Sequence, residues 1–300
     1  MNRGEIWSRF RSSHRAVLGL MILSLEILAV VFLPPLLGLD PAASDIHAGF
    51  FAPPSPLHPL GTDGAARDLL ARTLCGGRLS LLAGLTAPLI GAAVGLPLGL
   101  AAGYYRGAVE AALMGAANVF MCLPNLFLAL IVLTLVRPSP VSVVVVIGLV
   151  SWTDTAKLAH SLVVSIREQD YIASAVTIGE SEWQILTREI LPGVLSPVLA
   201  SLSFQAGGAV LLGSALSYLG AGIPSPWASW GSIISAAQDI SVLTGAPWVW
   251  VPSGTLIVLT SASLHFIGRG LRDALDPKMN SWNPGCRGIE PSEFDGGSAV

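Results

Sequence analysis

The sequence predicts an all-α integral membrane protein with six transmembrane helices. Its 300 residues are 52% hydrophobic and only 12% charged, with a mean hydropathy of +0.68. A soluble domain carries about 25% charged residues, so this chain has roughly half the charge that a water-facing surface needs. This composition excludes an ordinary soluble enzyme. The net charge of -3 and the lack of a basic block also argue against a nucleic-acid partner.

Six stretches are long and apolar enough to cross the hydrocarbon core, which takes about 20 residues of helix. The first holds a single charge, Glu26. We expect it to be a retained anchor, because it is too long for a cleaved signal peptide and lacks a small-residue cleavage site. The expected spans are residues 16–39, 79–103, 111–136, 141–157, 197–221 and 248–268.

The distribution of Lys and Arg predicts that both termini are cytoplasmic. With that orientation the inner side holds 12 of the 16 cationic residues, as the positive-inside rule requires. The remaining four are Arg67, Arg72, Arg78 and Arg137. The non-spanning segments are then a cytoplasmic N-terminus (1–15), an external segment (40–78), outer loops (137–140 and 222–247) and a disordered cytoplasmic tail rich in Gly, Ser and Pro (279–300).

A long inner loop separates the fourth and fifth spans. Residues 158–196 are amphipathic and contain YIASAVTIGESEWQILTREILPGVL. Apolar positions recur at helical spacing, Gly179 interrupts them, and the run ends at Leu191 and Pro192. This pattern predicts two short helices joined by a turn at Gly179. A docking element for a soluble partner and an interfacial linker lying on the headgroups fit it equally well.

A second charged segment, HPLGTDGAARDLLARTLCGGRLSLLAG, leads into the second span. Asp63 and Arg67 are four residues apart, as are Asp68 and Arg72, so a short amphipathic helix with internal ion pairs is one interpretation. By spacing alone, a solvated segment ahead of the span is the simpler one.

Together these segments resemble the inner-membrane permease subunits of the dipeptide, oligopeptide and nickel family of ABC importers, specifically the C-type subunit. The external segment is similar to the family signature HxLGTDxxGRDxxSRxxxGxRxSL, and the inner loop resembles the EAA loop of binding-protein-dependent permeases. A third block, from LSYLGAGIPSPW to RGLRDALDPK, resembles the family's carboxy-terminal run. The chain departs from the pattern at Ala66, Ala173 and Ser174, where the family has Gly, Glu and Ala.

The resemblance implies a MetI-like permease fold of type I importers, with a core over residues 79–278. In such importers an external binding protein delivers cargo to a pore between two homologous permeases, while one or two kinds of cytoplasmic ATPase subunit drive the cycle. The implied partners are therefore a homologous permease, ABC ATPases, the binding protein and the lipid of the inner membrane. ATP and Mg would be held by the partners, because this chain has no GxxxxGK[ST] loop. We expect no catalytic residue, cofactor or metal site in this chain.

The resemblance also implies three groups of functional residues. Those expected to couple to the ATPase are Tyr171, Ala175, Ile178, Gly179, Glu180, Ser181, Trp183, Leu191 and Pro192. Those of the external signature are Gly61, Thr62, Asp63, Arg67, Asp68 and Arg78. Polar candidates for the pathway are Asn118, Asn125, Ser203, Gln205 and Ser214, and for each of them an interhelical hydrogen bond is the alternative.

Within the family, peptides are the favoured cargo and nickel or a nickel chelate is the second choice, since no His, Cys or Met cluster at metal-ligand spacing lines a span. An ion-coupled secondary transporter is the rival class. It would be expected to carry buried charges near the bilayer midplane, and Glu26 is the only clear mid-span charge. A membrane-embedded enzyme would need a motif such as HExxH or GxSxG, which the sequence lacks.

Overall fold

The computed structural model describes residues 3–137, 139–224 and 226–275, and the expected tail at 279–300 lies outside them. Within this part of the chain every regular element is helical, apart from two isolated β-bridges. Five helical segments are long and apolar enough to cross a membrane, and a bent pair of helices adds a sixth if it is counted as one span. The predicted all-helical fold class is confirmed.

The helices follow one another with short connections, except for the external segment before α3. Their bounds are α1 (Arg3–Ser12), α2 (His14–Leu36), α3 (Leu69–Tyr105), α4 (Gly107–Met121), α5 (Asn125–Leu135), α6 (Pro140–Val150), α7 (Trp152–Arg167), α8 (Asp170–Thr177), α9 (Glu182–Gln184), a π-helical turn (Ile185–Ile190), α10 (Leu191–Tyr218), α11 (Trp230–Ile234), a 3-10 turn (Ser235–Gln238), α12 (Ile240–Gly245) and α13 (Pro247–Leu275).

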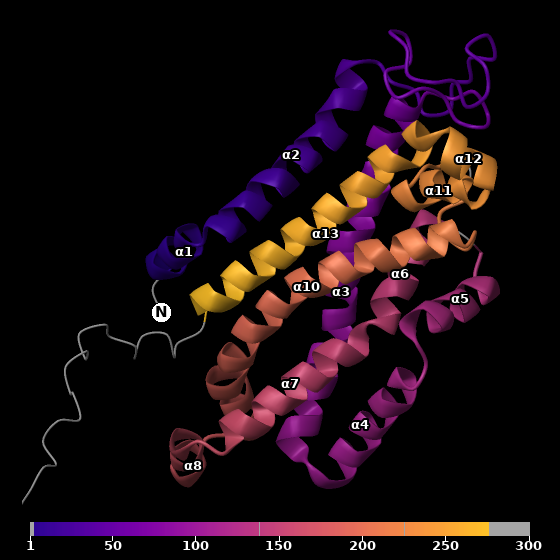
Figure 1. The fold of residues 1–300 in the computed structure, drawn as a ribbon. Helices are drawn as coiled ribbons and strands as arrows, with labels where there is room; N and C mark the ends of the chain where they lie inside the picture. The colour runs from indigo at the N-terminus through magenta and orange to yellow at the C-terminus, as the bar shows by residue number, and fades with distance from the viewer. Residues whose placement is uncertain (1–2, 138, 225, 276–300) are drawn as a thin grey trace, which may run out of the picture.

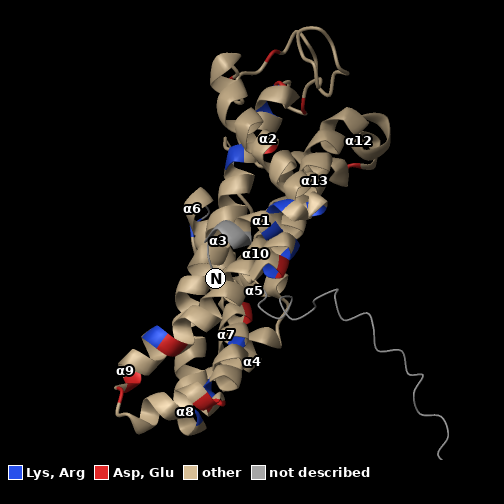
Figure 2. Cartoon of the chain, turned by 90° about the vertical axis from the view of Figure 1, so that its left-hand side faces the viewer, with Lys and Arg blue, Asp and Glu red and all other residues tan. Residues whose placement is uncertain are grey.

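Figure 1 shows the long helices side by side in a bundle, with α3 at its centre. The external segment, α11 and α12 lie at one end of the bundle, and α8 lies at the other. Helix α3 packs along α2, α6, α7 and α10, while α13 packs between α2 and α10. Many of the charged residues lie in and around α8 and α9, in α1 and in the external segment (Figure 2). The middle of the bundle is therefore the part suited to lipid.

The third expected span, 111–136, is wrong as a single helix. The chain bends by 89° between α4 and α5. Pro124 occupies the position just before α5, and proline cannot supply the N–H that a continuous helix would use there. Figure 1 shows α3 descending to the α8 end and α6–α7 descending to it again, so α4 and α5 carry the chain back in two legs.

Other spans extend beyond their predicted bounds. Helix α3 begins at Leu69 rather than at residue 79, because Asp68 caps it by accepting a 2.7 Å hydrogen bond from the N–H of Ala71. The fourth span continues through α7 to Arg167. The predicted outer loop at 222–247 contains α11 and α12. Apolar composition marks the stretch that lies in lipid, whereas helices continue past it wherever capping and packing allow.

Four glycines of α3 form a stripe that faces α6 and α7. They recur every four residues, at 91, 95, 99 and 103, and therefore lie on one face of the helix. A Cβ at each of them would overlap or crowd atoms of residues 148–163, mostly backbone atoms and small side chains. Without side chains here the two backbones approach closely, which is how helices gain packing energy in a membrane.

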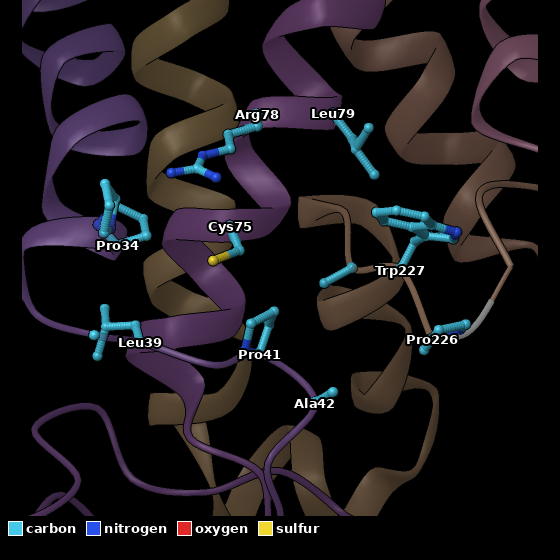
Figure 3. Close-up of a pocket in the computed structure, with 12 residues that line it drawn as sticks. Pro34, Leu39, Pro41, Ala42, Cys75, Arg78, Leu79, Pro226 and Trp227 are labelled. Atoms are coloured by element: carbon cyan, nitrogen blue, oxygen red, sulfur yellow. The ribbon is translucent and has the colours of Figure 1, made fainter.

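Arg78 joins α3 to α2 at a break in the α2 hydrogen-bond ladder. In an α-helix the carbonyls of Val30 and Val31 accept from the N–H groups of residues 34 and 35, but these are Pro34 and Pro35. Arg78 Nε donates to the Val30 carbonyl at 2.9 Å and Nη2 donates to the Val31 carbonyl at 3.0 Å. Figure 3 shows the guanidinium reaching towards α2 in this way. The side chain replaces both missing donors.

Removing the Arg78 side chain should destabilise the protein, because the carbonyls of Val30 and Val31 would have no hydrogen-bond donor. We expect Arg78→Ala to lower the free energy of unfolding by about 1–3 kcal/mol, because the carbonyls of Val30 and Val31 lose their donors and the first of them is partly buried. In a Pro34→Ala/Pro35→Ala background the backbone N–H groups of residues 34 and 35 are restored. Arg78→Ala should then lower the free energy of unfolding by less than about 1 kcal/mol. Thermal unfolding in mild detergent measures both; an equal loss in the two backgrounds would contradict the assignment.

Candidate functional site

The external segment, residues 40–68, is folded around the carboxylate of Asp63. Its Oδ1 accepts hydrogen bonds from the N–H groups of Ala65 and Arg67, at 2.8 and 2.9 Å. Its Oδ2 lies 2.9 Å from Arg67 Nε and 3.1 Å from Arg72 Nε. Asp63 is only 8% exposed, so the charge is buried with two cationic partners. This arrangement fixes the turn that leads into α3.

Of the two interpretations of this region, the amphipathic helix with internal ion pairs is wrong, and the solvated segment, which spacing alone favours, does not describe Asp63, whose side chain is buried. Asp63 and Arg67 do pair, but they lie in a turn ahead of α3. Arg72 pairs with Asp63 across that turn rather than with Asp68, whose carboxylate caps α3. Spacing alone could not show this, because helical and turn geometry both place the side chains within reach.

Gly61 and Thr62 pin the segment to its own earlier part. Thr62 is fully buried; its Oγ1 donates to the carbonyl of Gly49 at 2.7 Å and accepts from the N–H of Ala52 at 2.9 Å. Gly61 has a φ of +74°, and a Cβ there would overlap the carbonyl oxygen of Ala52. The predicted signature residues are thus brought together by backbone geometry as well as by charge.

At the other end of the bundle, the inner loop folds as α8, a turn and α9. Gly179 has a φ of +85°, which explains why the helix stops there. Ser181 caps α9: its hydroxyl accepts from the N–H of Gln184, whose side chain returns a bond to the N–H of Ser181. The two short elements and the turn at Gly179 agree with the sequence pattern.

The coupling candidates divide into buried and exposed groups. Ala175 is buried with Ile172 against α7, α10 and the lower part of α3, so it holds the loop in place. In contrast, Ile178 is 77% exposed and Trp183 is 72% exposed. Tyr171, Gly179 and Ser181 are also exposed, and Glu180 is half-buried. The exposed members form a largely apolar surface at the tip of the loop.

Leu191 and Pro192 do not end the loop, contrary to the sequence-based expectation. They lie in the first turn of α10, directly after the π-helical turn, where the Leu191 N–H donates to the Leu186 carbonyl five residues back and Pro192 has no N–H to donate. A π-helical turn connects α9 to α10 without a break. The fifth span therefore continues directly from the inner loop, from Glu182 to Tyr218.

Two of the five polar pathway candidates, Gln205 and Ser214, make interhelical or local hydrogen bonds. Gln205 Nε2 donates to Thr155 Oγ1 of α7 at 3.2 Å, and Ser214 donates to the carbonyl of Val210. Asn118 is exposed on α4 and Asn125 is half-buried at the start of α5. Ser203 lies in α10 beside Gly268 of α13. None of the five lines the cavity of about 500 Å³ near Cys75 that Figure 3 shows.

Glu26 is buried between α2 and α13. It is 6% exposed and its Oε2 accepts a 2.7 Å hydrogen bond from Thr260 Oγ1. Sequence analysis identified the charge but not its partner, since nothing in the spacing relates residues 234 positions apart.

The chain matches known proteins along most of its length. Residues 95–281 match the family described as "Binding-protein-dependent transport system inner membrane component". Residues 3–54 match the N-terminal transmembrane domain of oligopeptide transport permease C. The chain belongs to this family of transport permeases. It is a membrane-spanning component of a binding-protein-dependent importer, as the resemblance implied.

Three relatives show how far this similarity extends. A protein of Brucella suis that carries the name of a peptide permease is 34% identical over 90% of this chain and 89% of its own length. A Brucella abortus protein named as a peptide transport system permease is 36% identical over 89% of each chain. The glutathione transport system permease protein GsiD of Pectobacterium atrosepticum is 34% identical over 92% of this chain and 91% of its own.

A solved structure shares the fold at lower identity. The methionine ABC transporter MetNI, in inward-facing conformations, superposes with a TM-score of 0.53 and 17% identity. The match covers 69% of this chain and 96% of that one. The predicted MetI-like fold is thereby confirmed.

The close approach at Gly61 gives a prediction with a matched control. Gly49 lies in the same segment and also has a positive φ, +89°, but nothing lies within 4 Å of a Cβ built there. Gly49→Ala should lower the free energy of unfolding by about 1 kcal/mol, from backbone strain alone. Gly61→Ala should lower it by at least about 2 kcal/mol more, because the segment must also move away from the new Cβ. Equal resistance of the two variants to limited proteolysis would show that the contact at Gly61 is unimportant.

Proposed function

We propose that this chain is a pore-forming permease of an ATP-driven importer that carries peptides. The support for the cargo is that the relatives described above are named for peptides or for glutathione, itself a tripeptide. Nothing favours nickel: among the described residues no group of three or more His, Cys, Asp or Glu side chains is placed to hold a metal. Selection among peptides would rest largely with the binding protein.

The coupling surface at the tip of the inner loop is the observation that carries the mechanism. Ile178 and Trp183 are large apolar side chains held in water at a polar end of the molecule. Ile172 and Ala175 anchor the same loop from below. Large exposed aromatics of this kind act as anchors in protein interfaces. In our proposal an ABC ATPase covers this surface, and its movements on binding and hydrolysing ATP tilt α10 and α7 through the loop.

The remaining assignments complete this proposal. The chain pairs with a homologous permease as a heterodimer, and one or two kinds of ATPase subunit bind ATP and Mg, so that this chain performs no catalysis. The external segment meets the binding protein or braces the partner permease. Both termini and the coupling loop face the cytoplasm, in agreement with the Lys and Arg distribution.

Two experiments test the proposal. The tagged chain is purified in mild detergent, and its companions are identified by mass spectrometry; a second permease and one or two ATPases are expected. If the chain were purified alone or as a homo-oligomer, this result would contradict the proposal.

A second experiment tests the cargo. Uptake of labelled di- and oligopeptides is compared in cells with and without the chain, and nickel uptake is measured in the same cells to test the alternative cargo.

Trp183 offers a direct test of the coupling surface. Trp183→Ala should leave the unfolding midpoint unchanged, because the side chain is exposed. It should reduce the amount of ATPase that co-purifies at least tenfold, which corresponds to a loss of about 1.4 kcal/mol or more of binding free energy. Trp227→Ala is the matched control: Trp227 is 57% exposed but precedes α11, at the opposite end of the bundle. If both variants retain the ATPase equally, the coupling assignment fails.

Gly179 tests whether the turn itself matters. No atom lies within 4 Å of a Cβ built there, so only the left-handed backbone limits substitution. Asn tolerates this conformation and Val does not. We therefore expect Gly179→Asn to keep at least half of the uptake and Gly179→Val to lose most of it, with insertion intact in both. Equal uptake by the two variants would show that transport does not depend on the left-handed turn at Gly179.

A further inference from the structure

A histidine in the external segment lies between two carboxylates. His58 Nδ1 is 2.7 Å from Asp68 Oδ2, and its Nε2 is 3.4 Å from Asp45 Oδ2. A neutral imidazole carries one N–H, so it can donate to only one of them and turns a lone pair towards the other. The imidazolium donates from both nitrogens. Two carboxylates that face the two ring nitrogens therefore favour the doubly protonated ring.

The two carboxylates belong to different parts of the fold. Asp68 is the N-cap of α3, and its other oxygen accepts from the N–H of Ala71. Asp45 lies near the start of the external segment, where its N–H donates to the carbonyl of Ala66 at 2.8 Å. His58 thus ties the start of the segment to the helix at the centre of the bundle.

The segment held in this way covers part of the outer end of the bundle. Phe51 and Leu60 pack on a buried cluster formed by α3, α11, α12 and α13. Any loosening between residues 44 and 58 would uncover that cluster and the start of α13.

We propose that His58 is a proton-dependent clasp, which holds residues 44–58 against the start of α3 at acidic and neutral pH and releases them at alkaline pH. This inference goes beyond the transport function proposed above. It concerns the folding of the external segment, whichever cargo passes.

The direction of the effect follows from the charges around the ring. The hydrogen bond to Asp68, followed by the contacts with Asp45, raises the pKa of His58 above its ordinary value of about 6.5, although burial opposes this. In return, the hydrogen bond from His58 lowers the pKa of Asp45. A group with a raised pKa in the folded state stabilises that state fully below about pH 6.5 and loses this contribution as pH rises through the raised value.

Among the residues that the structure describes, Asp68 and Asp45 are the charged groups that act on the ring. Asp63, Arg67 and Arg72 pair among themselves within the adjoining turn. The residues of α12 and α13 that pack on the segment, Val242, Trp248 and Val249, carry no charge. Release of the clasp should therefore follow the titration of this one histidine.

Hydrogen–deuterium exchange of the full chain in mild detergent tests the clasp, with labelling times scaled for the intrinsic pH dependence of exchange. Between about pH 5.5 and 9, the amides of residues 44–62 should exchange at least about threefold faster above a midpoint higher than 6.5. His58→Gln, which carries no charge at any pH, should exchange fast throughout and show no midpoint. His47→Gln is the matched control, since His47 is exposed in the same segment and should retain the transition.

A second variant decides the matter if His58→Gln does not accumulate. Asp45→Asn removes one of the two carboxylates, so the transition should move to lower pH. A pH-independent wild-type profile, a transition that persists in His58→Gln, an unmoved midpoint in Asp45→Asn, or loss of the transition in His47→Gln would each overturn the proposal.

Discussion

Every backbone carbonyl inside a membrane needs a donor, and this requirement explains much of the architecture. Hydrocarbon offers no water to an unpaired N–H or C=O, so the chain crosses as helices, whose backbone groups pair internally. The repair at Pro34 and Pro35 is made by Arg78 of another helix. A positive charge at the end of a span thus serves the backbone of its neighbour and joins the segment matched by one family description to the core matched by the other.

The two ends of the bundle are stabilised in different ways. The external segment has little regular structure, so it depends on buried charge, with Asp63 held by two arginines. An ion pair that loses one partner in such a place leaves an uncompensated buried charge, which is costly. The inner loop instead uses apolar anchors, Ile172 and Ala175, and leaves other apolar side chains exposed. The first arrangement places paired charges inside the segment, and the second leaves large apolar side chains exposed at the tip of the loop.

Much of this was predictable from the sequence, for reasons visible at particular residues. The spans followed from apolar length, and the turn at Gly179 followed from a glycine that interrupts a helical pattern. The break at Pro124 was also signalled, because proline removes a donor wherever it stands, but an unbroken apolar run concealed it. The glycine stripe of α3 could have been found from its four-residue period. In contrast, the contacts of Arg72 with Asp63 and of Glu26 with Thr260 depend on turn geometry or on distant segments, which spacing does not encode.

Helix α3 has a mechanical consequence, because it reaches from one end of the molecule to the other. Its 37 residues span about 55 Å, nearly twice the hydrocarbon thickness. Asp68 at its start is bonded to the external segment, while Tyr104 near its end packs in the cluster that carries the inner loop. A tilt of about 5° about one end displaces the other by about 5 Å, which is close to one helical turn. A small tilt of α3 at its inner-loop end is therefore linked by geometry to a displacement of several ångströms at the external segment.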